Sequence, residues 1–247
     1  MAQYPSKDAP RPDLQGRVAL ITGASRGIGY EAAKALAKSG AHVLALARTV
    51  GGLEDLDDEI KETGGACSLI PCDLTETEAL DRLGPILLER FGRIDILVAN
   101  AGDLGELAPV PDVDEKIWRR TFDINVHANW HLLKTLDPAL RASDAGRAVF
   151  LTSRIGGETA RAYWSPYAAS KAAMEMLAST YAEETAKTTL RVAIVDPGAT
   201  RTRMRAKAMP GEDPETLPHP SEIAPLIVHA ASPLYDGHAE RLIFRDW

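Results

Sequence analysis

A tyrosine and a lysine lie four residues apart in SPYAASKAA, which spans residues 165–173. At this spacing both side chains lie on one helical face and can interact. A free tyrosine has a pKa of about 10, and a nearby ammonium favours the phenolate and lowers that pKa. Ser165 suits the N-cap and Pro166 the first helical position, so Tyr167 is expected in the first turn, where the helix dipole also favours phenolate. Tyr167 and Lys171 are therefore candidates for acid–base catalysis, with a packed ring beside a surface cation as the alternative.

A glycine-rich segment, TGASRGIG, occupies residues 22–29 directly after an apolar run. Gly23, Gly27 and Gly29 give a G-x-x-x-G-x-G spacing, which differs from the more familiar G-x-G-x-x-G. Glycines permit a tight turn and let backbone N–H groups and a helix N-terminus approach a pyrophosphate. The segment predicts a dinucleotide site, against the alternative of an ordinary turn between strand and helix.

The end of the second apolar run carries a cation where a carboxylate often holds the ribose 2′-hydroxyl of NAD. The sequence there reads Ala47-Arg48-Thr49, and Arg26 lies within the glycine-rich segment. Guanidinium groups suit a 2′-phosphate. These residues predict a preference for NADPH over NADH, unless both arginines are solvated surface charges.

Short apolar runs alternate with longer amphipathic segments along the chain. The runs predict strands at 17–22, 42–47, 67–72, 94–99, 147–152, 191–196 and 241–244. The other segments predict helices at 27–39, 52–63, 75–91, 114–142, 166–187 and 221–231. Nearly continuous apolar strands are typical of sheets buried on both faces. We therefore expect an α/β, Rossmann-type doubly wound fold: a seven-stranded, mostly parallel sheet with helices on both faces, in three α/β/α layers.

The whole chain, 1–247, is expected to form one domain, since no internal repeat or low-complexity linker divides it. Residues 1–14 are polar and rich in proline, as in a flexible arm. The segment 199–220 is rich in Arg and Pro and has no clear period, which favours a substrate lid over a simple connector.

Composition narrows the class of protein further. The formal net charge of −7 and pI near 5.4 argue against nucleic-acid binding. Cys67 and Cys72 do not form a CxxC pair, and two cysteines favour a reducing compartment. The N-terminus has no signal-peptide h-region and no apolar run has the length of a membrane span. These observations predict a cytoplasmic protein without a membrane partner.

Seven motifs occur in one order along the chain: TGASRGIG, Asp73-Leu74, ANAG at 99–102, DIN at 123–125, Ser153, YAASK at 167–171 and DPG at 196–198. In this order, and from about Gly16 to the C-terminus, the chain resembles the single-domain branch of the short-chain dehydrogenase/reductase superfamily. ANAG departs from the common NNAG of that family by its first residue, Ala99.

The resemblance implies four catalytic residues: Asn125, Ser153, Tyr167 and Lys171. In the family, a hydride passes from the nicotinamide to a carbonyl carbon while the tyrosine protonates the oxygen. The lysine anchors the ribose and tunes the tyrosine, and the serine polarises the carbonyl. The asparagine orders a relay water, unless Asn125 is only a solvated side chain. Thr152 and Ser153 are expected to point to opposite sides of the strand, and Ser153 is preferred because the second hydroxyl of the pair matches the family.

The resemblance also implies the cofactor contacts, with NADP(H) as the cofactor. Asp73 is expected at the adenine amino group, unless it only caps a turn, and Thr202 at the nicotinamide carboxamide, unless it is an ordinary loop hydroxyl. The full predicted set is Gly23, Ser25, Arg26, Gly27, Ile28, Gly29, Arg48, Thr49, Asp73, Leu74, Asn100, Ala101, Gly102, Tyr167, Lys171, Pro197, Gly198 and Thr202.

Two further patterns can be explained without a functional site. His127 and His131 are four residues apart on a predicted helix, but no HExxH motif and no third ligand accompany them, so no metal site is predicted. Arg201, Arg203, Arg205 and Lys207 make the 199–220 segment basic. This pattern fits an anionic substrate or, more simply, a run of solvated charges.

Together these observations predict an NADPH-dependent oxidoreductase (EC 1.1.1.-) that reduces a ketone or aldehyde to an alcohol. An alcohol dehydrogenase working in the oxidative direction is one alternative, and a catalytically silent NADPH-sensing or scaffold protein is another. The resemblance implies a homodimer or homotetramer. The substrate walls are expected at about 103–110, 154–164 and 199–220, where no motif identifies the carbonyl compound.

Overall fold

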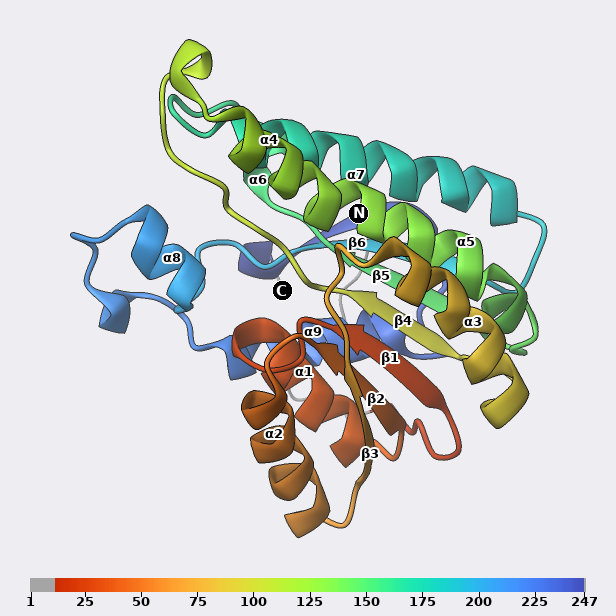
Figure 1. Cartoon of the computed structure of the whole chain (residues 1–247). Coiled ribbons are helices and arrows are strands. Elements are labelled where there is room, and N and C mark those ends of the chain that lie inside the picture. Colours follow the sequence, from red (N-terminus) through yellow and green to blue (C-terminus); the bar gives the residue numbers. More distant parts are fainter. Residues whose placement is uncertain (1–11, 247) are drawn as a thin grey trace.

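The protein, seen here as a computed structural model, is described over residues 12–246 and is built on one seven-stranded sheet (Figure 1). The strand order is β3-β2-β1-β4-β5-β6-β7, and every neighbouring pair is parallel. The predicted fold class is confirmed. The strands are β1 (Val18–Thr22), β2 (His42–Ala47), β3 (Ala66–Pro71), β4 (Ile96–Ala99), β5 (Arg147–Leu151), β6 (Arg191–Asp196) and β7 (Glu240–Ile243).

Helices follow most strands and return the chain to the end of the sheet at which the next parallel strand begins. Among the described residues, none of them is long and apolar enough to cross a membrane. The helices are α1 (Gly27–Lys38), α2 (Val50–Glu62), α3 (Thr77–Phe91), α4 (Glu115–Phe122), α5 (Ala128–Arg141), α6 (Arg154–Gly157), α7 (Ser165–Thr185), α8 (Arg203–Ala208) and α9 (Pro220–Ala231).

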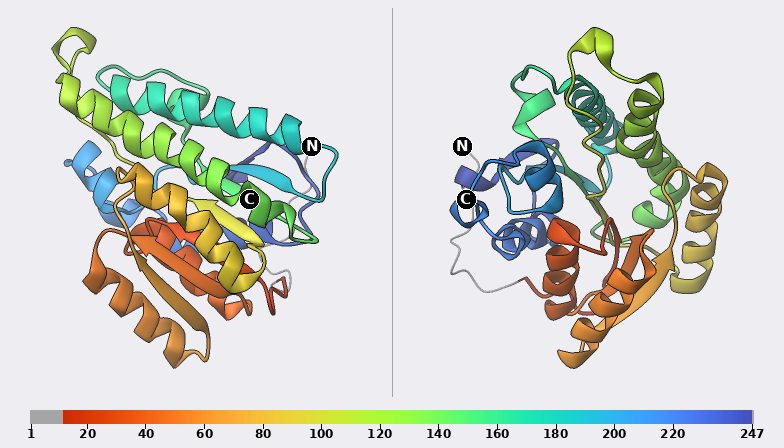
Figure 2. Two further views of the ribbon diagram at one scale, coloured as in Figure 1. Left: turned by 45° about the vertical axis from the view of Figure 1, so that its right-hand side comes forward. Right: turned by 60° about the vertical axis from the view of Figure 1, so that its left-hand side comes forward.

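The two faces of the sheet bury different side chains of the same strands, as the two further views in Figure 2 help to follow. In β1, Ala19 and Ile21 pack with α1, α2 and α9, whereas Val18 and Leu20 pack with α3, α5 and α7. This alternation gives two cores, one on each side of the sheet. The strands are thus held rigidly, and their carboxyl ends are brought to one edge.

The predicted helix at 114–142 is not continuous. A π-helical turn, Asp123–His127, separates α4 from α5. Such turns shift the hydrogen-bond ladder by one residue and often mark functional positions. The Asn125 side chain faces inward there and is 1% exposed, so the turn bears on the site.

The beginning of the chain and the 199–220 segment also differ in detail from expectation. Residues 1–11 of the predicted flexible arm lie outside the described residues. Leu14 is fully buried, and its N–H donates to the Ser39 carbonyl at 2.8 Å, so the end of that predicted arm packs on the protein. Within 199–220, the short helix α8 and a 3-10 turn at Pro214–Thr216 were not predicted.

We expect Gly84→Ala to destabilise the protein. A Cβ at this position would overlap the Thr135 carbonyl oxygen where α3 and α5 touch, and overpacking typically costs about 1–3 kcal/mol. Gly51→Ala is the matched control, because a Cβ at this helical glycine meets nothing within 4 Å. Urea unfolding should show a loss in the first variant and none in the second. Equal stabilities would contradict the close α3–α5 contact.

Candidate active site

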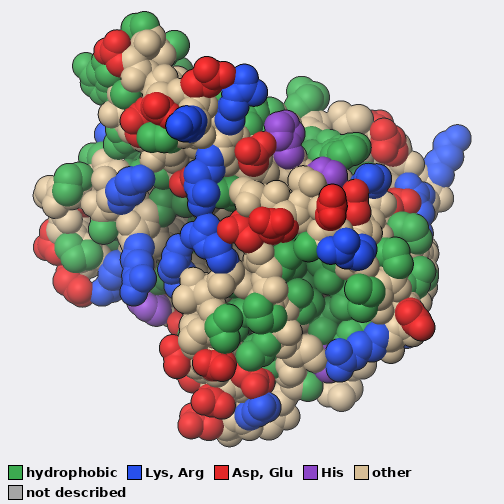
Figure 3. Space-filling model, viewed as in Figure 1, with side chains coloured by type: hydrophobic (Ala, Val, Ile, Leu, Met, Phe, Trp, Pro, Cys, Tyr) green, Lys and Arg blue, Asp and Glu red, His purple; other side chains and the backbone are tan. Residues whose placement is uncertain are grey.

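Residues after the carboxyl ends of the strands and residues of α8 line a large cleft; Figure 1 shows where α8 lies relative to the sheet. The volume of the cleft is about 810 Å³. Lys and Arg side chains gather on the face that carries this cleft (Figure 3), and eight arginines line the cleft, beginning with Arg26 and Arg48. The cleft is thus basic in a protein whose formal net charge is −7, and it suits an anionic ligand.

The glycine-rich segment is pinned to the end of β4 by Asn100. The Asn100 amide donates to the Thr22 carbonyl at 2.9 Å, and the Thr22 hydroxyl accepts from the Asn100 N–H at 3.1 Å. A Cβ at Gly23, which has a φ of +68°, would lie 2.9 Å from the Asn100 amide nitrogen; one at Gly29 would lie 2.5 Å from the Gly23 carbonyl oxygen. Only glycine fits this close approach, and the open side of the turn faces the cleft. The segment therefore fits the diphosphate of a dinucleotide.

Two predicted cofactor contacts, Arg48 and Asp73, bond to each other. Arg48 Nη1 lies 3.3 Å from Asp73 Oδ2, and the other carboxylate oxygen of Asp73 accepts from the Thr75 N–H at 3.0 Å and hydroxyl at 2.9 Å. The local turn considered for Asp73 is therefore present. Arg48 is largely exposed and borders the cleft beside Thr49, so a phosphate there would meet an available guanidinium.

Tyr167 and Ser153 meet at the inner end of the cleft. Tyr167 is 8% exposed, and its phenol lies beside the Ser153 side chain. The Ser153 hydroxyl accepts from the Ile155 N–H at 3.2 Å, which holds it at the start of α6. The Thr152 hydroxyl instead donates to Glu175. The two neighbouring hydroxyls thus point to different partners, as strand alternation predicts.

Lys171 is buried one helical turn after Tyr167. Its ammonium donates to the Leu151 carbonyl at 2.7 Å and lies 5.8 Å from the centre of the Tyr167 ring. A Cβ at Gly102 would lie 3.6 Å from the same nitrogen. The lysine therefore stands between the catalytic candidates and the ANAG segment, where a ribose would be within reach.

The expected lowering of the tyrosine pKa is not produced by the protein's own groups. Burial raises the pKa of Tyr167 to about 12, although the neighbouring Ser153 side chain acts in the opposite direction. Burial also lowers the pKa of Lys171 to about 8, which Glu175 and Asp196 partly oppose. Desolvation disfavours each charged form and outweighs the lysine–tyrosine attraction. For the protein's own groups the prediction from spacing was wrong, because it counted the charges near the tyrosine and left out desolvation of the buried phenol.

The predicted N-cap was also wrong. Helix α7 begins at Ser165 itself, with Trp164 as the N-cap residue and no capping side chain. The Ser165 hydroxyl is buried without a hydrogen-bond partner among the described residues. Trp164 takes another position: its ring packs edge-on against Tyr167, with 5.9 Å between the ring centres. Pro166 still lies in the first turn, so Tyr167 keeps its predicted place.

The Asn125 side chain joins three segments. Its amide donates to the Asp103 carbonyl and the Ser170 hydroxyl, both at 2.8 Å, and its oxygen accepts from the Asp103 N–H at 2.7 Å. The backbone carbonyl of Asn125 accepts from the Asn129 side chain at 2.8 Å. Asn125 thus fixes the π-helical turn against α7, close to Lys171, and the solvated side chain considered as an alternative is wrong.

The basic residues of the 199–220 segment are mostly engaged within the protein. Arg201 Nη1 lies 2.7 Å from Glu215 Oε1, Arg205 Nε lies 2.5 Å from Glu212 Oε2, and Lys207 donates to the Gly105 carbonyl at 2.9 Å. The Thr202 hydroxyl caps α8 by accepting from the Arg205 N–H at 3.1 Å. The interpretation as a run of solvated charges is therefore wrong for Arg201 and Arg205, whereas Arg203 and Lys207 are exposed.

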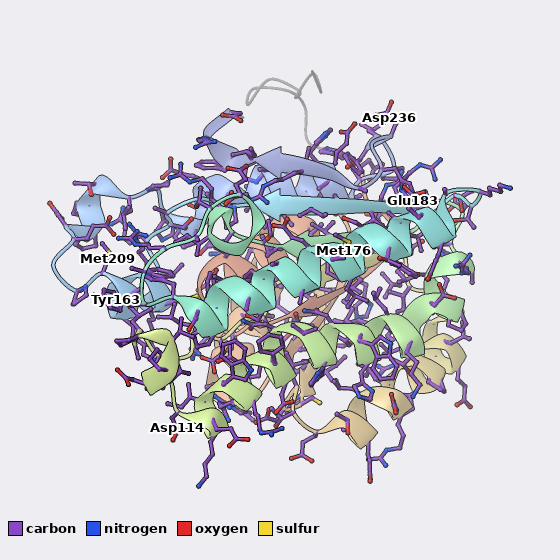
Figure 4. All side chains as sticks on the ribbon, turned by 90° about the horizontal axis from the view of Figure 1, so that it is seen from above. Asp114, Tyr163, Met176, Glu183, Met209 and Asp236 are labelled. Atoms are coloured by element: carbon purple, nitrogen blue, oxygen red, sulfur yellow. The ribbon has the colours of Figure 1, made fainter. Side chains whose placement is uncertain are left out.

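The cleft brings together almost all of the predicted site residues. Gly29 and Asn125 do not border the cleft, but they lie against residues that do: Gly29 against Gly23 and Asn100, and Asn125 near Gly102. The three predicted substrate segments also contribute, and Figure 4 shows Tyr163 and Met209, from two of them, at one end of the molecule. Sequence reasoning missed an apolar group around Tyr167, for which the tryptophan three residues before the tyrosine was the available signal. The group consists of Leu104, Ile155, Trp164, Met204, Ala208 and Met209.

The two histidines on the predicted helix bond to different carboxylates. His127 Nδ1 lies 2.9 Å from Asp123 Oδ1, and His131 Nδ1 lies 2.8 Å from Asp81 Oδ1. Within residues 12–246, no group of three or more His, Cys, Asp or Glu side chains could hold a metal ion. Both histidines thus have local partners.

A family model described as short chain dehydrogenase matches residues 17–213. The chain belongs to this family. Among curated members, it is 38% identical over 224 residues to the oxidoreductase YciK of Escherichia coli K12, an alignment that covers 88% of this chain and 87% of YciK. It is 35% identical over 221 residues to a fatty acyl-CoA reductase of Acinetobacter baylyi, covering 89% and 74% of the two chains.

Solved structures of family members superimpose closely on this chain. A short-chain dehydrogenase of Shigella flexneri 2a, complexed with NADP, has a TM-score of 0.91 and 36% identity and covers 96% of this chain and 100% of its own. A member from E. coli CFT073, complexed with NADPH, has a TM-score of 0.88 with the same identity and coverage. The sheet and cleft described above are thus those of an oxidoreductase family.

We expect Asn125→Ala to lower the free energy of unfolding by about 2–3 kcal/mol, because it leaves buried groups of Asp103 and Ser170 without partners. Asn129→Ala, which removes one hydrogen bond, should cost less. Urea unfolding of both variants measures the difference. A smaller loss for Asn125→Ala than for Asn129→Ala would contradict the joining position of Asn125.

Proposed function

We propose that this short-chain dehydrogenase is an NADPH-dependent carbonyl reductase, which converts a ketone or aldehyde into an alcohol. The observation that carries the proposal is that Ser153, Tyr167 and Lys171 line one cleft, with the buried Tyr167 phenol beside Ser153 and the Lys171 ammonium 5.8 Å from the centre of the phenol ring. The apolar group around Tyr167 supports an organic carbonyl compound as the substrate.

In this mechanism, Ser153 donates a hydrogen bond to the carbonyl oxygen and Tyr167 delivers a proton to it. The bound nicotinamide supplies the hydride. A neutral phenol is the form that donates, and a pKa raised to about 12 by burial keeps it protonated at neutral pH. Lys171 binds the ribose, and its charge offsets the phenolate left by proton transfer. Asn125 holds Lys171 in place through α7 and supports the proposed water relay.

The choice of NADP(H) rests on charge. Arg26 and Arg48 border the cleft at the glycine-rich segment and at the end of β2, where a 2′-phosphate is expected. The structural neighbours complexed with NADP and NADPH support the same cofactor. The other predicted contacts, from Gly23 to Thr202, belong to this proposal, with residues 199–220 as a substrate lid of one domain.

Two other functions are distinguished from this one by simple measurements. An alcohol dehydrogenase would oxidise an alcohol with NADP⁺ faster than it reduces the ketone at cellular pH. An NADPH-sensing or scaffold protein would bind NADPH without turnover. The buried Ser153–Tyr167–Lys171 grouping favours turnover, since a binding protein has no need of a desolvated acid.

The assembly that we propose is a homodimer or homotetramer in the cytoplasm. The outer surfaces of α5 and α7 expose the large apolar side chains Trp130, 49% exposed, and Met176, 67% exposed; Figure 4 labels Met176 on the outer side of α7. Such side chains on adjacent long helices suit contact with a second copy.

Tyr167→Phe should lower kcat at least a hundredfold, because it removes the proton donor, and leave the Kd for NADPH within about threefold of wild type. Turnover is followed by NADPH absorbance against a panel of ketones, quinones, sugars and acyl thioesters. Tyr163→Phe is the control, since Tyr163 is 59% exposed and does not border the cleft. Retained activity in Tyr167→Phe would reject the mechanism.

Arg48→Ala should weaken NADPH binding about tenfold or more, as expected for a lost charge-assisted hydrogen bond, and leave NADH binding nearly unchanged. Fluorescence titration of both cofactors measures the two effects. Equal affinity of the wild-type protein for NADPH and NADH would contradict the proposed preference.

A further inference from the structure

An arginine from the last strand lies among three carboxylates behind the proposed catalytic lysine. Arg241, in β7, is 18% exposed at its side chain. Its Nη1 lies 2.7 Å from Glu175 Oε1, its Nη2 lies 3.0 Å from Asp196 Oδ2, and its Nε lies 3.4 Å from Glu158 Oε1. Asp196 is almost fully buried. Nothing in the motifs of the sequence pointed to Arg241, Glu158 or Glu175.

Each carboxylate belongs to a segment that carries a site residue. Glu175 follows Lys171 by one turn of α7, and it accepts a hydrogen bond from Thr152, the neighbour of Ser153. Asp196 ends β6, directly before the Pro197-Gly198 turn. One guanidinium therefore joins the ends of β5 and β6 to α7.

The loop after Ser153 packs directly on this ion cluster. A Cβ at Gly157 would lie 2.8 Å from Arg241 Cζ and would overlap the Glu175 carboxylate. A Cβ at Gly156, which has a φ of +99°, would lie 3.0 Å from Lys171 Cβ. Both glycines let the loop touch the cluster and the lysine, so a displaced cluster would displace the substrate wall.

The cluster also carries an excess of negative charge beside a buried ammonium. Glu158, Glu175 and Asp196 surround one guanidinium, and Glu175 and Asp196 both act to raise the pKa of Lys171 against the effect of burial. The other titratable group against Lys171 is Tyr167, on the same helix. A carboxylate held within a few ångströms of an ammonium typically shifts its pKa by about 1–3 units.

We propose that Arg241 is a positioning residue for the reaction: it holds Glu175 and Asp196 in place behind Lys171, and through Glu175 and Thr152 it fixes the strand end that carries Ser153. This inference rests on the proposed function for its kinetic consequences. Its structural part, the coupling of Glu175 to the charge of Lys171, applies whether or not the protein reduces a carbonyl.

Two conservative variants separate the charge effect from the geometry. Glu175→Gln removes a negative charge and keeps the shape, so the pKa of Lys171 should fall by about one unit. The alkaline limb of the kcat/KM profile should move to lower pH with it.

Arg241→Lys keeps the charge, but a single ammonium cannot bond all three carboxylates as the guanidinium does. We expect kcat to fall about tenfold, with the pKa of Lys171 and the KM for NADPH near their wild-type values.

The pKa of Lys171 is measured by NMR titration of protein labelled with ¹³Cε-lysine, with Lys171→Arg to assign the signal. Arg119→Lys is the control, because Arg119 forms an exposed ion pair with Glu115 on the surface of α4. Urea unfolding verifies that each variant is folded.

The outcomes keep this inference and the proposed function apart. An unchanged Lys171 pKa in Glu175→Gln overturns the inference, whatever the activity. Wild-type kcat in Arg241→Lys overturns the positioning of the site by the guanidinium. A lowered Lys171 pKa in a wild-type protein that turns over no carbonyl compound supports the electrostatic coupling and rejects the proposed function alone.

Discussion

The burial of the Lys171 ammonium is the constraint on which the rest of the site depends. An ammonium that is 5% exposed loses much of its hydration, and it remains charged only where the protein supplies oxygen atoms and negative charge. The Leu151 carbonyl supplies a hydrogen bond, and Glu175 and Asp196 supply the charge. Arg241 forms ion pairs with both carboxylates, and the two loop glycines pack against Arg241, Glu175 and Lys171.

At the glycine-rich side of the cleft, close backbone contact holds the segments in place. Asn100 ties the glycine-rich segment to β4, and β4 lies between β1 and β5 in the sheet. The glycine-rich segment and the strand that leads to Ser153 are thus connected through the β1–β4 and β4–β5 ladders of parallel hydrogen bonds. Helices pack on both faces of these strands.

The elements and the motif residues could be predicted because they follow local rules. A buried parallel strand needs a continuous apolar run, and a site residue directly after such a run must lie at the same edge of the sheet, as Ser153 and Pro197 do. The errors have a common cause in tertiary burial. Ser165 was assigned as a cap, and a lowered pKa to Tyr167, from neighbours in sequence, whereas packing decided both. The ion cluster of Arg241 joins residues separated by 45 and 66 positions, which no local pattern encodes.

The 199–220 segment shows that cations clustered in a sequence need not form a basic surface in the folded protein. Its cations, taken from the sequence alone, describe a strongly basic surface, but Arg201 and Arg205 each bond to a glutamate that follows in the same segment. The Arg205 pair connects α8 to the turn after it, and Lys207 connects α8 to the Gly105 carbonyl. The side chains that this segment packs with Trp164 and Tyr167 are instead the apolar ones of Met204, Ala208 and Met209.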